Sequence, residues 1–229
     1  MRSVAALCRE LTADRRSDGE LLAVFRAERS ESAFLELLRR HGPLVWSTCQ
    51  RLLPDPADAE DAFQATFLVL VQQSRKLTHS PTVGPWLYRV AVLTARSAKR
   101  KNARQLVRQQ PLHDQFPADA PNSDLKVDLD DALLALPERY RDALVLCHLQ
   151  GYTRREAAER LGCPEGTLSA WLSRGLEKLR VRLRDRDPAR VLAVPLMSVP
   201  AVLATTAAKA AVAVSLGAAS VPPVVSSLV

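Results

Sequence analysis

Aromatic residues are scarce in this chain of 229 residues, where Phe, Trp and Tyr together make up 5%. No stretch alternates apolar and polar residues in the way that half-buried strands do. The apolar residues recur instead at the three- and four-residue spacing of helices. These two features predict an all-α protein.

Cysteine is also rare. The four cysteines lie far apart, with no Cys-x-x-Cys pair and no histidine at ligand spacing. We therefore expect no metal site and no cofactor. Isolated thiols of this kind are typical of reduced cysteines, so we expect a cytoplasmic protein. No nucleophile–base pair and no glycine-rich phosphate loop stands out, and we expect no enzyme.

Long hydrophobic runs are missing from most of the sequence. Charges interrupt the first 16 residues, so a signal peptide is not expected. Residues 191–229 contain a single charge, Lys209, and the uncharged run on each side approaches membrane-spanning length. Pro195 and Pro200 interrupt the first run, however, and both runs are rich in small residues. We expect residues 187–229 to form a disordered or loosely helical Ala/Val/Pro-rich tail, without stable membrane association, that can be deleted from residue 190 onward without loss of folding.

The charges, with a formal net value of +7, are unevenly distributed. Residues 96–108 carry six positive charges and no acid, whereas residues 114–131 contain six aspartates and one lysine. Segregated blocks of this kind indicate nucleic-acid-binding surfaces separated by an acidic linker. Three prolines place that linker at residues 109–124. The sequence thus predicts one helical domain at 17–108 and a second at 125–186.

In the first domain, helix starts are marked by capping residues. Ser17 or Asp18 can cap one helix, and Asp55-Pro56 begins another. Between them we expect a helix over residues 31–53, which Pro43 can bend. Another helix runs from Trp86 to about residue 108. Acids in the first turns after Asp55 favour the positive end of the helix dipole, and a docking site is the alternative interpretation.

The second domain contains a helix-turn-helix pattern. We expect helices over residues 125–136 and from Pro137 to Leu149, with the proline at the first helical position. Then Thr153 and Glu156 have the capping-box spacing, and Gly162 with Pro164 marks a turn into the next helix. That helix has an apolar stripe formed by Leu168, Leu172, Gly175, Leu176 and Leu179.

Small and basic residues lie beside or opposite this stripe. Such residues suit a recognition helix in the major groove, where bulky side chains would block entry. They are Ser169, Ala170, Ser173, Arg174 and Lys178. An ordinary helical hairpin with a solvated face is the alternative interpretation.

Three long stretches resemble a known family. LLAVFRAERSESAFLELLRRHGPLVW with DAEDAFQATFLVL, and VGPWLYRVAVLTARSAKRK, look like region 2 of the extracytoplasmic-function group of the sigma-70 family. LPERYRDALVLCHLQGYTRREAAERLGCPEGTLSAWLSRGLEKLR looks like region 4 of the same family. These proteins are promoter-specificity subunits of bacterial RNA polymerase. The resemblance covers roughly residues 18–184 and implies a region 2 helical bundle joined to a region 4 helix-turn-helix domain.

The resemblance also implies roles for single residues. Docking on core RNA polymerase would involve Asp58, Asp61 and Gln64. Contacts to the −10 promoter element, and its melting, would involve Lys76, Trp86, Tyr88, Arg89, Arg96 and Arg100. The −35 element would be read by the second helix of the helix-turn-helix, with Thr167 and Trp171 added to the five small and basic residues. Trp171 stands where the family often has arginine, so one phosphate contact is lost.

The partners expected from this resemblance are core RNA polymerase and promoter DNA, with an anti-sigma factor as a further candidate. Two other interpretations are considered. A stand-alone helix-turn-helix regulator would not need the DAEDAFQ and WLYRVA segments. A membrane-anchored interaction protein is supported only by residues 191–229.

Overall fold

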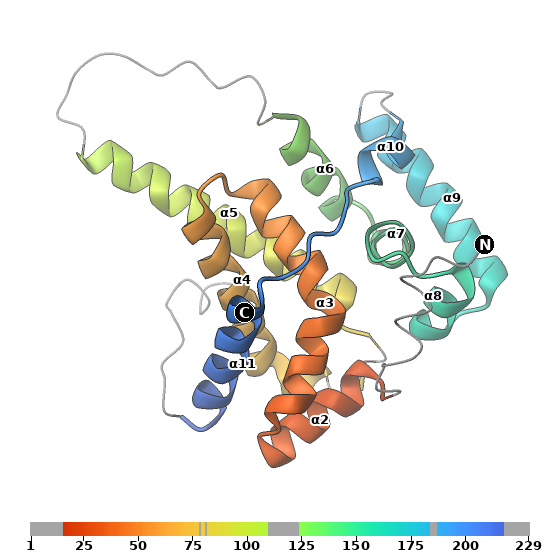
Figure 1. The fold of residues 1–229 in the computed structure, drawn as a ribbon. Coiled ribbons are helices and arrows are strands. Elements are labelled where there is room, and N and C mark those ends of the chain that lie inside the picture. The colour runs from red at the N-terminus through yellow and green to blue at the C-terminus, as the bar shows by residue number, and fades with distance from the viewer. Residues whose placement is uncertain (1–15, 78, 81, 110–123, 184–186, 218–229) are drawn as a thin grey trace.

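The computed structural model describes residues 16–77, 79–80, 82–109, 124–183 and 187–217, and all regular elements in these ranges are helical (Figure 1). The predicted linker lies almost wholly outside the described residues. The elements are α2 (Asp18–Glu28), α3 (Glu31–Leu52), α4 (Pro56–Leu77), α5 (Gly84–Gln109), α6 (Asp124–Leu134), α7 (Glu138–Leu144), the π-helix η1 (Val145–Leu149), α8 (Arg154–Leu161), α9 (Glu165–Arg182), α10 (Pro188–Leu192) and α11 (Ala201–Ser215). The prediction of an all-α fold is confirmed.

The predicted helix starts of the first domain are confirmed by their caps. Ser17 and Glu20 form a complete capping box at the start of α2. The Asp55 carboxylate accepts hydrogen bonds from the amides of Ala57 and Asp58 at the start of α4. These side chains satisfy amides that have no partner within the helix. Pro43 does not end α3, which continues to Leu52.

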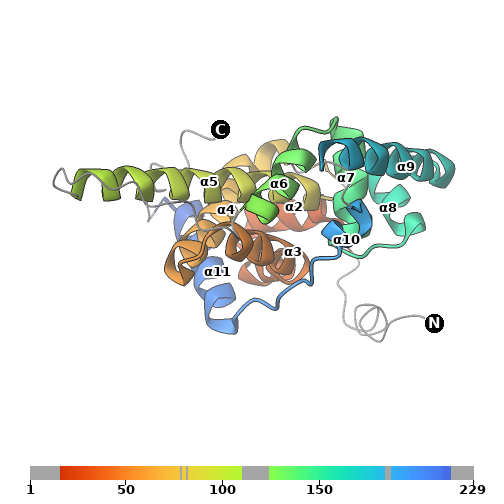
Figure 2. The same ribbon diagram turned by 90° about the horizontal axis from the view of Figure 1, so that it is seen from above.

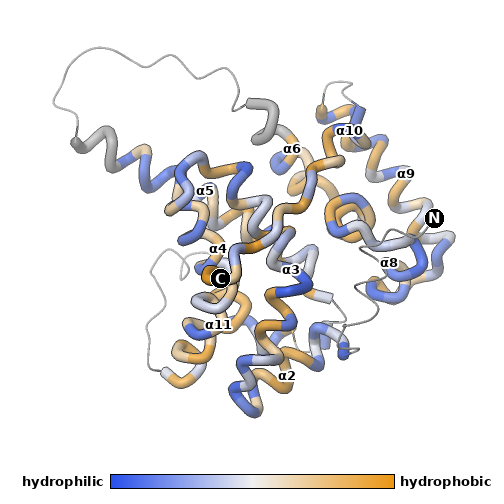
Figure 3. The backbone as a smooth tube through the Cα atoms, in the orientation of Figure 1, coloured by the Kyte–Doolittle hydropathy of each residue, from blue (hydrophilic) through white to orange (hydrophobic). Residues whose placement is uncertain are grey.

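Helices α2 to α5 form one bundle. Phenylalanines fill its centre: the ring centroids of Phe25 and Phe34 are 4.8 Å apart, and those of Phe63 and Phe67 are 5.0 Å apart. All four rings are buried. The few aromatic residues of the chain are thus concentrated where they remove most apolar surface from water. Beyond the bundle, α5 continues outward with a hydrophilic outer half (Figures 2 and 3).

Helices α6 to α9 form the second part of the fold. Its two proline helix starts differ from the prediction, because Pro137 and Pro164 occupy the N-cap and not the first helical position. The proline ring fixes φ near the value that either position needs, so the sequence could not distinguish them. Gly175, within the predicted apolar stripe of α9, allows a close approach to α7. A Cβ atom there would lie 3.2 Å from Cδ1 of Leu144, in α7.

The tail requires a correction. Its described part contains α10 and α11, and both pack on the rest of the protein. The residues that it buries are Pro188, Leu192, Leu203, Ala207, Ala208 and Ala211. The prediction of a loose tail outside the folded domains was therefore wrong for residues 188–215. The small residues that argued against a packed helix are themselves part of the packing, because Ala207, Ala208 and Ala211 are buried. No helix in the described ranges is both long and apolar enough to cross a membrane.

The two parts of the fold touch along one side. Helix α6 contacts α3, and η1 contacts α5, so that buried residues of both parts belong to one continuous hydrophobic cluster. In Figure 1, α6, α7 and α8 line the edge of the bundle that α3 and α5 form. The α5 segment predicted to contact the −10 element therefore lies against the domain that contains the helix-turn-helix.

The tight packing at Gly175 leads to a stability prediction. Gly175→Val forces two methyl groups against Leu144, and overpacking of this kind costs about 1–3 kcal/mol of unfolding free energy. Gly166→Val in the same helix is the matched control, because no atom lies within 4 Å of a Cβ there. Urea unfolding of both variants measures the difference. Equal stability of the two variants would contradict the packing of α7 on α9.

Candidate nucleic-acid interface

The helix-turn-helix forms as its local sequence requires. Thr153 and Glu156 make both hydrogen bonds of the capping box at the start of α8. Gly162 ends this helix in the left-handed conformation, with φ of 63°. The next amide, that of Cys163, donates to the carbonyl oxygen of Ala158 at 3.0 Å. The amides of Gly162 and Cys163 are therefore both satisfied by carbonyl groups at the end of α8.

The exposed side of α9 carries the predicted small and basic residues. Ala170, Ser173, Arg174 and Lys178 are exposed, whereas Thr167 and Ser169 are half-buried at its flank. The opposite side buries four members of the predicted stripe, Leu168, Leu172, Gly175 and Leu179. Leu176, the fifth, is only half-buried. A helix with one packed side and one open side of small residues can lie in the major groove of DNA.

Trp171 lies at the inner flank of α9. It is half-buried against the hydrophobic core and lines a surface hollow together with Pro137, Arg139 and Leu161. The tryptophan thus supplies apolar packing at this place and has no charge to offer a phosphate. Arg174 has a neighbour within the protein. Burial acts to raise the pKa of Tyr140, but the adjacent guanidinium groups of Arg174 and Arg139 lower it.

The residues predicted to contact the −10 element differ in how exposed they are. Lys76, Arg89 and Arg100 are exposed, and Trp86 is half-buried. Tyr88 is fully buried and donates a hydrogen bond to Asp130, so it cannot contact DNA in this structure. Arg96 is half-buried and forms an ion pair with Asp131. Both acids belong to α6, within the helix predicted over residues 125–136.

Asp130 is the centre of a buried ionic cluster. The Arg51 guanidinium donates two hydrogen bonds to its carboxylate, Nε at 3.1 Å and Nη2 at 2.5 Å, and the Tyr88 hydroxyl adds a third. Burial, followed by the negative charge of Asp130, raises the pKa of Tyr88 well above its ordinary value. The hydroxyl therefore remains a donor, and α6 stays fixed to both α3 and α5.

A second buried cluster lies around Asp18. Its carboxylate accepts from the Val83 amide at 2.9 Å and lies 2.7 Å from Nε2 of His41. The other ring nitrogen of His41 lies 3.1 Å from the amide nitrogen of Gln150, at the end of η1. A histidine that donates through Nε2 and accepts at Nδ1 satisfies both contacts. Burial acts to raise the pKa of Asp18, but His41, Val83 and Arg40 lower it well below its ordinary range.

Gln150 also fits closely against the segment before α5. A Cβ atom at position 84 would lie 2.2 Å from the side-chain oxygen of Gln150, so Gly84 leaves the space that this contact needs. The chain of contacts from Val83 through Asp18 and His41 to Gln150 joins the predicted −10 loop to the second part of the fold. Sequence reasoning missed it, because none of these residues belongs to a helical stripe or a charge block.

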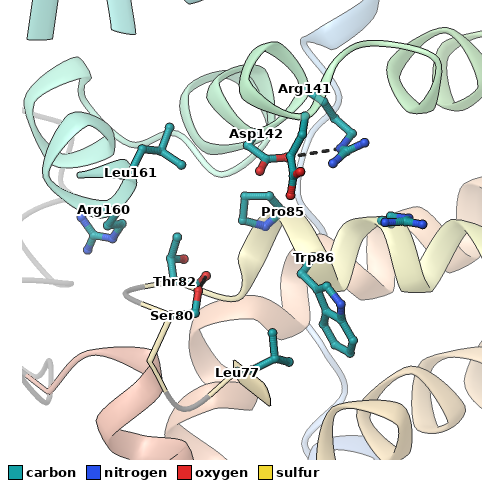
Figure 4. A pocket seen from close by; sticks show the side chains of 11 residues that line it. Leu77, Ser80, Thr82, Pro85, Trp86, Arg141, Asp142, Arg160 and Leu161 are labelled. Carbon is teal, nitrogen blue, oxygen red and sulfur yellow. Dashed lines mark hydrogen bonds and ion pairs between the residues drawn. The ribbon is translucent and has the colours of Figure 1, made fainter. Parts of the chain in front are cut away.

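The segment predicted to contact the −10 element faces α7 and α8 of the second domain across a pocket (Figure 4). From one side it is lined by the loop and first turn of α5, including Thr82, Pro85 and Trp86. From the other side it is lined by α7 and α8, including Asp142 and Arg160. The space beside Trp86 is therefore partly covered by the helix-turn-helix domain.

The residues predicted to dock on polymerase lie near the start of α4. Asp61 is exposed, and Gln64 is half-buried. Asp58 is half-buried and accepts a hydrogen bond from the side-chain amide of Asn102, in α5. Asp61 is thus the most accessible of the three residues. Among the described residues, no group of three or more His, Cys, Asp or Glu side chains could hold a metal ion.

A two-part helical protein with a recognition-type helix and a basic helix end belongs to the class of DNA-binding transcription proteins. Comparison with known families makes this specific. The model for sigma-70 region 2 matches residues 37–105, and the model for sigma-70 region 4 matches residues 126–179. The chain belongs to the extracytoplasmic-function group of the sigma-70 family of RNA polymerase sigma factors. Its function is that of a promoter-specificity subunit of bacterial RNA polymerase.

Two relatives among known proteins support this membership. The RNA polymerase sigma factor CarQ of Myxococcus xanthus is 32% identical over 162 residues, which are 69% of this chain and 93% of CarQ. The sigma factor SigE of Mycolicibacterium smegmatis is 33% identical over 171 residues, which are 69% of this chain but 65% of SigE. A solved structure of CnrH with the cytosolic domain of CnrY has 21% identity and a TM-score of 0.37, and covers 74% of this chain and 98% of CnrH.

Asp142, in the covered pocket, predicts a pH dependence. Burial raises its pKa from 3.8 to about 6, against the Arg141 guanidinium beside it, and Glu138 raises it further. Between about pH 4 and 6 the unfolded chain has lost this proton and the folded chain still holds it. This group therefore lowers stability as pH rises through that window.

We expect Asp142→Asn to remove this loss and to raise stability at pH 7 by on the order of 2 kcal/mol. Urea unfolding at several pH values between 4 and 7 measures the effect as the difference from the unmodified chain. Glu159→Gln, at an exposed acid of α8, is the control and should leave the pH curve in place. A curve that Asp142→Asn does not change would rule out a burial-raised pKa at this position.

Proposed function

We propose that three surfaces of this chain perform the work of a sigma factor. The exposed side of α9 reads the −35 element, the loop before α5 and the basic outer part of α5 engage the −10 element, and the start of α4 docks on core RNA polymerase. The observation that carries this proposal is the order of the two family regions together with the open, small-residue side of α9. Such a subunit acts in the cytoplasm by binding, without chemistry of its own.

The −10 part of this proposal includes a movement. Trp86 and Arg89 line a pocket whose other wall is the helix-turn-helix domain, and Tyr88 is buried against α6. Unstacked bases are recognised by stacking and by edge contacts, which need open access to aromatic and polar side chains. We infer that region 4 moves away from region 2 before these residues meet the melted strand. An anti-sigma partner stays a prediction.

Polymerase docking is tested by reversing charge at the start of α4. Asp61→Arg combined with Gln64→Ala should weaken binding to core polymerase by about tenfold or more, which corresponds to ~1.4 kcal/mol. The control is Glu28→Arg, which reverses an exposed acid at the end of α2. Pull-down or fluorescence titration with core polymerase measures both. Unchanged affinity of the double variant would remove the docking assignment.

Promoter reading is tested at the exposed cation of α9. Arg174→Ala should reduce −35 binding by the polymerase complex, measured by titration at several salt concentrations. A phosphate contact would lower affinity on all sequences and reduce the salt slope by about one, whereas a base contact would relax preference at one position by about 1–3 kcal/mol.

The matched control for this experiment is Arg180→Ala, further along the same exposed side and beside Glu177. It should leave sequence preference unchanged. If Arg174→Ala changes neither affinity nor preference on any −35 sequence, α9 is not the reader. DNA binding that needs no polymerase would favour the stand-alone regulator.

A further inference from the structure

The tail begins on the helix-turn-helix domain. Asp187 caps the short helix α10 through the Ala189 amide, and α10 packs against α9 and η1. Its Leu192 is fully buried. The first described part of the tail is therefore attached to region 4, directly after the helix proposed to read DNA.

The tail then crosses to region 2. Residues 193–200 form no regular structure and run along α3, as Figures 1 and 2 both show. The Met197 amide donates to the Ser47 hydroxyl at 2.7 Å. Val199 lies so close to α3 that a Cβ added at Gly42 would be 2.9 Å from its Cγ2 atom. Glycine at position 42 is thus the residue that lets the tail pass.

The last described helix of the tail, α11, packs on α3 and α4. Leu203, Ala207, Ala208 and Ala211 face these helices and are buried, whereas Val202 on the outer side is 79% exposed. Figure 3 shows α11 as one of the most hydrophobic helices of the fold. Apolar burial of this kind is the main favourable term in packing, so α11 is a specific attachment to region 2.

We propose that residues 187–217 are a strap that holds region 4 closed against region 2. One end is attached to region 4 and the other to region 2, and the closed arrangement covers Tyr88 and one side of the Trp86 pocket. Release of α11 from α3 and α4 then favours the open form. The effect on transcription rests on the proposed function, whereas the mechanical role does not.

A strap of this kind changes the apparent affinity for core polymerase by shifting the populations of the open and closed forms. If only the open form docks productively, the apparent dissociation constant is the intrinsic one divided by the open fraction. Each ~1.4 kcal/mol by which the strap favours the closed form therefore weakens apparent binding about tenfold. Removing the strap should tighten binding by the same factor.

The test uses the full chain with Ala208→Glu, which places a charge in the α11 packing surface. Val202→Glu is the matched control, because it adds the same charge on the exposed side of the same helix. We expect Ala208→Glu to increase the radius of gyration in small-angle X-ray scattering and to tighten binding to core polymerase about tenfold or more. Val202→Glu should leave both unchanged. A radius of gyration that does not differ between the two variants would overturn the strap.

If Ala208→Glu prevents cooperative folding, Gly42→Ala decides the question. The added methyl group meets Val199 of the tail, and its next contacts, with Phe63, are at ordinary distances. It should open the chain, and adding Val199→Ala should close it again by restoring the space. Gly42→Ala without any increase in the radius of gyration would contradict the proposal.

The scattering measurement needs neither DNA nor polymerase. An opened variant that fails, like the unmodified chain, to bind core polymerase would therefore contradict the proposed sigma function and leave the strap standing. If every variant binds core polymerase and none differs in radius of gyration, the strap is contradicted and the proposed sigma function stands.

Discussion

The relative position of the two regions depends on two buried aspartates that accept hydrogen bonds from distant parts of the chain. Asp18 joins the loop before α5 to His41, and through it to Gln150 of region 4; Asp130 of region 4 accepts from Arg51 and Tyr88 of region 2. A buried carboxylate is costly unless its oxygens have partners. Few arrangements of the regions satisfy both carboxylates at once, so these contacts specify one closed arrangement.

The same contacts explain why a closed arrangement can also open. Polar groups that separate exchange their protein partners for water, so the net loss per hydrogen bond is modest. Apolar surface gains no such partners in water. The tail supplies apolar surface away from the polar contacts, where α11 covers α3 and α4. Polar contacts thus give the arrangement its geometry, and the apolar tail adds attraction. This division of roles suits a protein in which region 4 covers part of the region 2 surface beside Trp86.

Trp171 contributes to the packing of α9 and carries no charge for a phosphate contact. On the inner flank of α9 it widens the apolar side of the recognition helix and leaves the open side to small residues and to Arg174 and Lys178. The chain therefore relies on fewer long cations next to the proposed groove. Backbone contacts position a protein on DNA without reading its sequence, so we expect tryptophan at this position to bear on affinity more than on base choice.

By itself the sequence determined the helices, the turn and the family. Capping boxes, the glycine at position 162 and the stripe on α9 act within a few residues, and the structure confirmed them. The tertiary structure decided which of the residues predicted to contact DNA are exposed. Tyr88 and Arg96 face α6, Asp130 is a buried hydrogen-bond partner of Arg51 and Tyr88, and α11 covers α3 and α4. These pairings join residues far apart in the chain, up to 150 positions for Ser47 and Met197. Periodicity and capping describe only neighbours in sequence, so no local pattern could reveal them.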